Sequence, residues 1–128
     1  MTDQLFPRTV QLRVGVLGSS GYVGKQVMRT VTRAGHHGVA VKAPRLTWLS
    51  AYGRNLESSA LLVARQTGLT ESLRGLDVVI NAAGIPSASA PAADLIGANA
   101  FLPLVVALAC EKAQVDHFIQ VSSAAVQG

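Results

Sequence analysis

Several residue types are scarce in this chain, and each scarcity narrows what the protein can be. The only cysteine, Cys110, leaves no partner for an internal disulfide, so a reducing, cytoplasmic setting is the default expectation. Charged residues make up only 14% of the chain and hydrophobic residues 49%, which is typical of a globular protein rather than a disordered one. A length of 128 residues predicts a single domain, spanning 1–128.

Long hydrophobic runs are also missing. The first ten residues lack the apolar segment of a secretory signal. The most apolar stretch, Leu95 to Cys110, is interrupted by Asn99 and Pro103, and it is shorter than the roughly 20 residues that span a bilayer. We therefore expect a buried helix in this stretch and no membrane contact.

Aromatic residues are few, at 5%, and the positive charge is unevenly placed. Ten of the 11 lysines and arginines lie within residues 1–74, which hold only three acids. A basic half favours an anionic partner. The cations are scattered and few aromatics are present to stack bases, so nucleic acid is a poor candidate and a phosphate-bearing cofactor explains the charge with fewer assumptions.

Glycine is regularly spaced in one stretch, GSSGYVG at residues 18–24. It follows an apolar run, Leu12 to Leu17, and precedes a segment with apolar residues at helical spacing, Tyr22 to Ala34. A strand, a glycine turn and a helix let phosphates approach the backbone closely and meet free N–H groups at the helix N-terminus. The alternative is a tight strand-to-helix turn with no ligand.

The remaining chain alternates apolar runs with helical segments, which predicts right-handed crossovers and a parallel sheet. The expected fold class is α/β, a Rossmann-like doubly wound sheet of about five strands in the order 3-2-1-4-5, with a ligand crevice between the first and fourth strands. Pro103 should kink the longest helix or lie near a break in it. Strands are expected at 10–17, 39–42, 59–64, 76–81 and 116–122, and helices at 19–34, 70–73 and 91–113, while 46–56 is either a short helix or a loop.

Three motifs in this order resemble the short-chain dehydrogenase/reductase superfamily. They are GSSGYVG at 18–24, LRGLDVVINAAG at 73–84 and VDHFIQVSSAAVQG at 115–128. The resemblance runs from about residue 12 to the end and is nearest to the extended or atypical branch, which contains sugar-nucleotide epimerases, dehydratases and reductases. It implies an NAD(P)(H)-binding domain that serves hydride transfer to or from a nicotinamide cofactor.

The resemblance also implies roles for particular residues. Ser123 matches the family's active-site serine, which orients the substrate's oxygen, and Asn99 matches an asparagine on the long helix. The pyrophosphate is expected on the glycine turn, and the riboses beside the end of the fourth strand. The implied cofactor-binding residues are Gly18, Ser20, Gly21, Tyr22, Val23, Gly24, Asn81, Ala82, Ala83 and Gly84.

Two cations bear on the choice of cofactor. NAD-specific relatives place a carboxylate at the end of the second strand, where it accepts the ribose 2′-hydroxyl. The region from Val41 to Leu46 has no acid but contains Lys42 and Arg45, which would pair with a 2′-phosphate. These residues favour NADP(H) over NAD(H), the alternative being that Lys42 is a solvated loop residue.

The superfamily's catalytic Tyr-x-x-x-Lys pair is absent. Tyr22 and Tyr52 are followed four residues later by Gln26 and Leu56. In the family this pair lies beyond the serine, and the sequence ends five residues after Ser123. We therefore expect the N-terminal portion of a longer oxidoreductase, with a complete, non-catalytic dinucleotide-binding or sensor module as the alternative.

Other readings and questions stay open. The glycine motif also resembles the N-terminal domain of semialdehyde dehydrogenases, although the ending VSSAAVQG fits that family poorly. Neighbouring His36 and His37 are expected in a solvated loop rather than at a metal. The sequence does not name the small-molecule substrate, and it leaves a homo-oligomer open.

Overall fold

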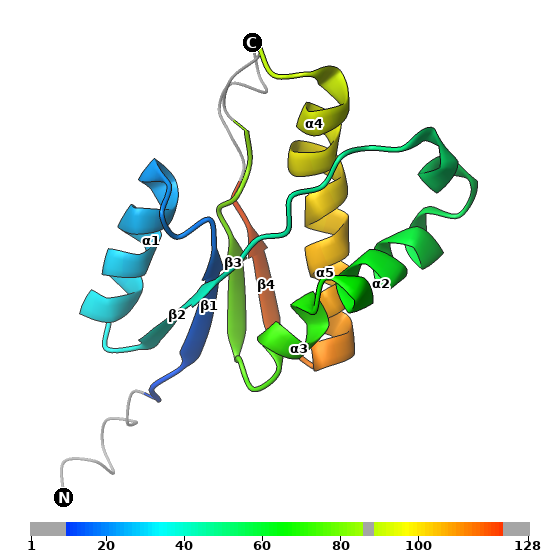
Figure 1. The fold of residues 1–128 in the computed structure, drawn as a ribbon. Helices are drawn as coiled ribbons and strands as arrows, with labels where there is room; N and C mark the ends of the chain where they lie inside the picture. The colour runs from blue at the N-terminus through cyan, green and yellow to red at the C-terminus, as the bar shows by residue number, and fades with distance from the viewer. Residues whose placement is uncertain (1–9, 86–88, 122–128) are drawn as a thin grey trace, which may run out of the picture.

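The computed structural model describes residues 10–85 and 89–121. Four parallel strands form one sheet in the order β2-β1-β3-β4 (Figure 1). The position between β1 and β3 is the point where the chain reverses its direction across the sheet. The α/β class and this switch point are confirmed. The strands are β1 (Arg13–Leu17), β2 (His37–Val41), β3 (Val78–Asn81) and β4 (His117–Gln120).

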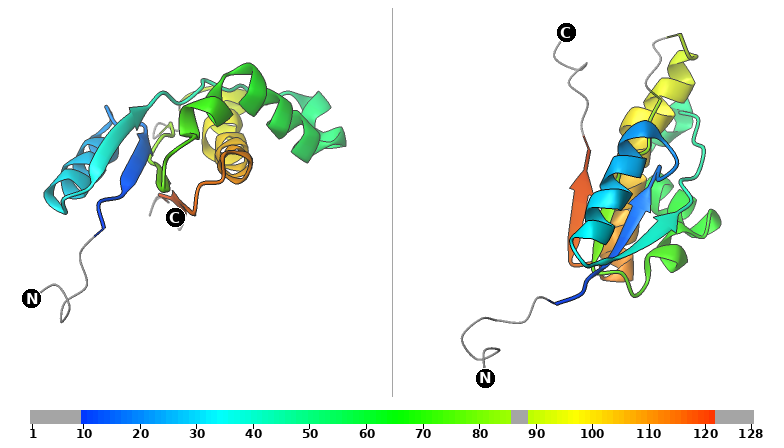
Figure 2. Two further views of the ribbon diagram at one scale, coloured as in Figure 1. Left: turned by 90° about the horizontal axis from the view of Figure 1, so that it is seen from below. Right: turned by 90° about the vertical axis from the view of Figure 1, so that its left-hand side faces the viewer.

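Helices cover both faces of the sheet (Figure 2). One face packs against α1 (Tyr22–Arg33) through Val14, Val16, Val31 and Val78. The larger core lies on the other face, where Leu17 and Val79 meet the remaining helices. Burial on both faces explains why the two central strands, β1 and β3, are nearly continuous apolar runs rather than alternating ones. The helices of the second face are α2 (Leu56–Gln66), α3 (Leu69–Leu73), α4 (Ala92–Ile96) and α5 (Leu102–Ala113).

The predicted strand at 59–64 is wrong, because this segment lies inside α2, so the sheet has four strands rather than five. Asn55 caps the helix, its side-chain oxygen accepting from Ser58 N at 3.2 Å, and Glu57 lies in the first turn. Ala60 and Ala64 are four residues apart and both buried, which is helical spacing. A short apolar run carries too little periodicity to distinguish strand from buried helix.

Residues 46–56 were expected to be either a short helix or a loop, and the structure contains both. An extended strap at residues 43–49 leads into a 3₁₀ turn, Ser50–Arg54. The Tyr52 ring stacks on Phe101 with centroids 4.7 Å apart, and Trp48 meets both rings edge-on. These aromatic contacts attach the strap and the turn to the core.

The longest helix runs continuously from Ala92 to Ala113, with a π-helical turn at Gly97–Phe101 between α4 and α5. Pro103 lies in the first turn of α5, directly after the π turn, so the expected irregularity precedes the proline. The α5 segment buries Val105, Val106 and Ala109, which confirms the buried helix. By length and composition alone the 22-residue run could also cross a membrane, a test that core helices of soluble proteins pass as well.

Cys110 provides a test of this packing. It is 3% exposed, and burial raises the pKa of its thiol to about 11 from an ordinary value of 9.0. Because the thiolate is the reactive form, we expect alkylation by iodoacetamide at pH 8 to be about 100-fold slower in the native chain than in the unfolded chain. Equal rates in buffer and in concentrated urea, followed by mass spectrometry, would contradict the buried position of α5.

Candidate nucleotide-binding site

The glycine turn connects β1 to α1 at the switch point of the sheet. Gly18 has a φ of +74°, a left-handed conformation that side chains rarely adopt, and its carbonyl accepts from Gly21 N at 3.1 Å. A Cβ on Gly18 would lie 2.7 Å from the Cα of Ala83. The turn is therefore pressed against the loop that follows β3.

The three glycines serve two different purposes. A Cβ on Gly24 would overlap the carbonyl oxygen of Gly18, so Gly24, like Gly18, is required by the fold itself. Gly21 is different, because among the described residues a Cβ there would meet only the Gly18 carbonyl oxygen, at an ordinary 3.4 Å. Its backbone, with φ −76° and ψ 173°, is accessible to any residue. The space beside Gly21 is open on the outer side of the turn.

Free N–H groups surround that open space. The Gly21 carbonyl accepts from Lys25 N at 2.9 Å, but within residues 10–85 and 89–121 the N–H groups of Tyr22, Val23 and Gly24 have no hydrogen-bond partner. No side chain caps the helix and its first turn has no acid. Tyr22 is 84% exposed, so its ring does not cover the turn. Uncapped N–H groups and the positive end of the helix dipole together suit an anion.

The loop after β3 is held by two asparagines. Asn81 is fully buried: its Oδ1 accepts from Ala83 N at 3.1 Å, and its Nδ2 donates to Gln120 Oε1 at 2.9 Å. Asn99, in the π turn, accepts from Ile85 N at 2.9 Å and donates to Ile85 O at 3.0 Å. These bonds fix the backbone of residues 82–85 against the glycine turn.

A hollow of about 560 Å³ lies between this loop and the strap that follows β2. The strap is anchored at its far end, where Trp48 N donates to Ala93 O at 2.9 Å and Thr47 Oγ1 donates to Asp94 Oδ1 at 3.0 Å. The hollow therefore has walls from two strand ends and the long helix. Its lining consists of residues 43–47 of the strap, residues 83–85 of the loop, and Asp94, Ala98 and Leu102.

Lys42 and Arg45 lie where the strap leaves β2. Both side chains are exposed, and Arg45 lines the hollow. In the described part of the chain neither cation has an ion-pair partner. Arg45 is therefore available to an anionic group that enters the hollow, whereas Lys42 precedes the lining by one residue and is exposed outside it.

Comparison with models of protein families shows which family this chain belongs to. The sequence model described as "NAD dependent epimerase/dehydratase family" matches residues 14–128. The chain belongs to this family. A comparison with curated proteins finds no significant match.

Solved structures similar to this family member confirm its fold. MoeE5 in complex with UDP-glucose and NAD is 19% identical with a TM-score of 0.67, and the match covers 91% of this chain and 38% of MoeE5. For the UDP-glucuronic acid 4-epimerase from Bacillus cereus in complex with NAD, the identity is 22%, the TM-score 0.65, and the coverage 91% and 42%. A nucleoside-diphosphate-sugar epimerase from Pseudomonas aeruginosa is 25% identical with a TM-score of 0.56, covering 90% and 34%. The chain thus spans about two fifths of the length of these structures or less.

The structure of this family member brings most of the expected site residues together. The glycine turn contacts Ala82 and Ala83, and Arg45 lines the same hollow as Gly84. Asn81 faces its protein partners, so its contribution is to shape the loop. Ser123 and its neighbour Ser122 lie outside the described residues.

Sequence reasoning missed the strap and its attachment. Gly97 is the signal that could have found it, since a Cβ there would overlap the Leu46 carbonyl oxygen. A glycine inside a helical pattern often marks such a close backbone approach. His36 was expected in a solvated loop, but its Nδ1 accepts from Leu12 N at 3.0 Å. No metal-binding group of three or more ligands occurs among residues 10–85 and 89–121.

Proposed function

We propose that this chain binds a nicotinamide dinucleotide, NADP(H) in preference to NAD(H), as the cofactor-binding portion of a sugar-nucleotide epimerase, dehydratase or reductase. The observation that carries the proposal is the open space at Gly21, beside three N–H groups of α1 that have no partner in the described part of the chain, at the sheet's switch point. A pyrophosphate needs both the space and the donors. Similar structures that are complexed with NAD support this class of ligand.

Each part of the proposed site has a physical task. The first turn of α1 binds the pyrophosphate, and the hollow between strap and loop receives the adenosine portion, with Ala83 and Gly84 beside the riboses. When bound, the cofactor supplies the acceptor or donor of a hydride. Ser123 is proposed to hold the reacting oxygen of the substrate by a hydrogen bond.

A second candidate function is dinucleotide binding without catalysis. Within this chain neither tyrosine is suited to proton transfer: Tyr52 is stacked on Phe101, and Tyr22 has Gln26 rather than lysine four residues later. Neither is thus placed to transfer a proton with lysine assistance. A protein containing this chain that binds NADPH but never oxidises it with sugar-nucleotide substrates would favour this second function.

The preference for NADP(H) rests on Lys42 and Arg45, because no acid lies between Val41 and Leu46 to accept a 2′-hydroxyl. We expect Lys42→Ala to weaken NADPH binding about 10-fold or more, since one charge-assisted hydrogen bond to the 2′-phosphate is lost. NADH binding should change less than about 2-fold, because NADH has a hydroxyl there. Isothermal titration calorimetry with both cofactors measures the two affinities.

Arg29→Ala is the matched control, since it removes an exposed cation from the outer side of α1 and should leave both affinities unchanged. Equal weakening of NADPH and NADH by Lys42→Ala would contradict the role at the 2′-phosphate. Tighter binding of NADH than NADPH to the unaltered chain would contradict the preference itself.

A further inference from the structure

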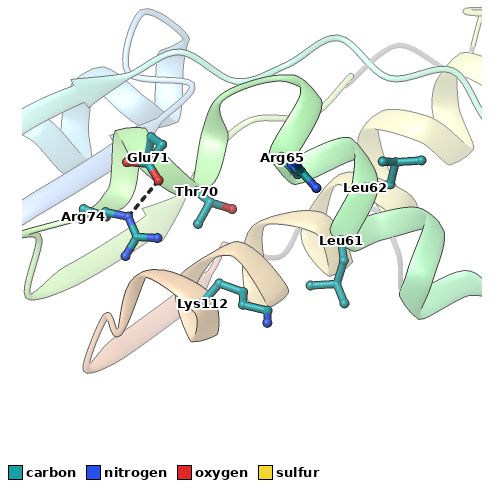
Figure 3. A pocket seen from close by; sticks show the side chains of 7 residues that line it. All are labelled: Leu61, Leu62, Arg65, Thr70, Glu71, Arg74 and Lys112. Atoms are coloured by element: carbon teal, nitrogen blue, oxygen red, sulfur yellow. Dashed lines mark hydrogen bonds and ion pairs between the residues drawn. The ribbon is translucent and has the colours of Figure 1, made fainter.

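A second hollow, of about 530 Å³, lies on the helical face formed by α2, α3 and α5 (Figure 3). It lies near the amino ends of the strands, because Leu73 ends α3 just before β3 and Ala113 ends α5 just before β4. The glycine turn, in contrast, follows the carboxyl end of β1. The first hollow, lined by segments that follow β2 and β3, and this second hollow therefore lie toward opposite ends of the strands.

Cations from three separate elements converge on this second hollow. Arg65 comes from the last turn of α2, Lys112 from the last turn of α5, and Arg74 directly follows α3. One acid, Glu71, is present, and it is already bonded to Arg74, with Nε and Oε1 2.9 Å apart. Within the described ranges neither Arg65 nor Lys112 has an ion-pair partner, so the lining keeps an excess of positive charge.

The helix dipoles account for only part of this arrangement. A cation in the last turn of a helix is stabilised by the negative end of the dipole, which explains Arg65 and Lys112 one at a time. It does not explain why the two side chains and Arg74 line one concavity, where their mutual repulsion opposes the dipole effect. An anion in the hollow would offset that repulsion.

The rest of the lining is apolar or carries a hydroxyl. Leu61 and Leu62 contribute apolar groups to the lining from consecutive positions of α2, where they point in different directions (Figure 3), and Leu62 is 52% exposed. Thr70 adds a hydroxyl that can donate to an oxyanion. The volume is within the range of small-molecule sites, in which an apolar wall meets a few placed polar groups.

We propose that this hollow binds a phosphate monoester with an apolar or aromatic body, independently of the dinucleotide site. The phosphate, close to doubly charged at neutral pH, pairs with Arg65 and Lys112, and the body lies against Leu61 and Leu62. The site depends on α2 being a helix. Had residues 59–64 formed the fifth strand expected from the sequence, Leu61, Leu62 and Arg65 would not share a lining with Lys112 of α5.

The probe is phenyl phosphate. Inorganic phosphate serves for comparison, because it carries the phosphate group but no aromatic ring. The titrations use the chain carrying Gly21→Val, so that the glycine turn cannot hold the probe. Isothermal titration calorimetry gives affinities, and amide chemical shifts locate the contact. The test variant is Arg65→Gln with Lys112→Gln, and the matched control is Arg29→Gln with Arg33→Gln, which removes the same charge from the exposed side of α1.

We expect phenyl phosphate to shift amides of α2 and α3, and to bind about 10-fold more weakly to the Arg65/Lys112 variant than to the control. Inorganic phosphate should bind more weakly than phenyl phosphate, because it leaves the leucines uncovered. Equal losses in both double variants would indicate non-specific charge attraction and would overturn the proposal. Shifts confined to α1, equal affinity for the two probes, or tighter binding of an acidic peptide would overturn it as well.

Discussion

Replacing Gly21 by valine is expected to abolish dinucleotide binding while the fold survives. Valine can adopt the extended backbone of this position, and among the described residues a Cβ there meets only the Gly18 carbonyl oxygen, at 3.4 Å. The branched side chain would instead fill the space in front of the N–H groups of Tyr22 and Val23. Losing two charge-assisted hydrogen bonds corresponds to about 3–6 kcal/mol, or at least a 100-fold loss of affinity.

The measurement is calorimetric titration with NADPH, beside a thermal melt by circular dichroism. Gly53→Val is the matched control, since a Cβ at Gly53 meets nothing within 4 Å and the position lies in the 3₁₀ turn away from α1. The control should bind NADPH as the unaltered chain does. A Gly21→Val chain that keeps its affinity within about 3-fold would remove the pyrophosphate from the glycine turn, and with it the proposed function.

The central part of the fold could be predicted because several local signals agree there. The apolar run up to Leu17, the glycine turn and the helix from Tyr22 onward each indicate the same unit, and the structure contains it. The runs ending at Val41, Asn81 and Gln120 are strands of the same parallel sheet, of which the one ending at Asn81 is largely buried. Consistent local signals of this kind are what make a topology readable from one sequence.

The segment around Ala60 and Ala64 could not be read in the same way. Its residues suit either a strand or a buried helix, and the deciding interaction is tertiary, since α2 packs against α5 through small side chains. This one difference leaves β2 without the expected outer neighbour among the described residues and creates the basic hollow beside Arg65. The wrong prediction of a strand at 59–64 therefore accounts for the difference between the four-stranded sheet and the expected five-stranded one.

At the candidate site, the residue types could be anticipated but their partners could not. The sequence places Asn81 at the end of a strand, yet only the fold shows that its side-chain amide donates to Gln120 on the neighbouring strand. The same holds for Asn99, which reaches back 14 residues to bond the backbone of Ile85. Such pairs depend on strand order and helix placement, which local patterns do not encode.

Gly24→Ala should lower the stability of the fold, although the same change in an ordinary helix raises it by roughly 1 kcal/mol. Gly24 lies in the first turn of α1, and its Cβ would overlap the carbonyl oxygen of Gly18. Gly18 cannot yield easily, because its own Cα faces the backbone of Ala83. Relieving the overlap requires α1 to move away from the turn, which we expect to cost about 3 kcal/mol.

The change should lower the melting temperature by roughly 10 °C for a chain of this size. Gly21→Ala is the matched control: the added atom is the same, but it meets only an ordinary contact at 3.4 Å. Exchanging glycine for alanine at this capping position should cost no more than about 1 kcal/mol. Equal melting temperatures of the two variants, or a higher one for Gly24→Ala, would show that the close contact between α1 and the turn does not require glycine at position 24. The division of the three glycines into two structural residues and one ligand-facing residue would then be wrong.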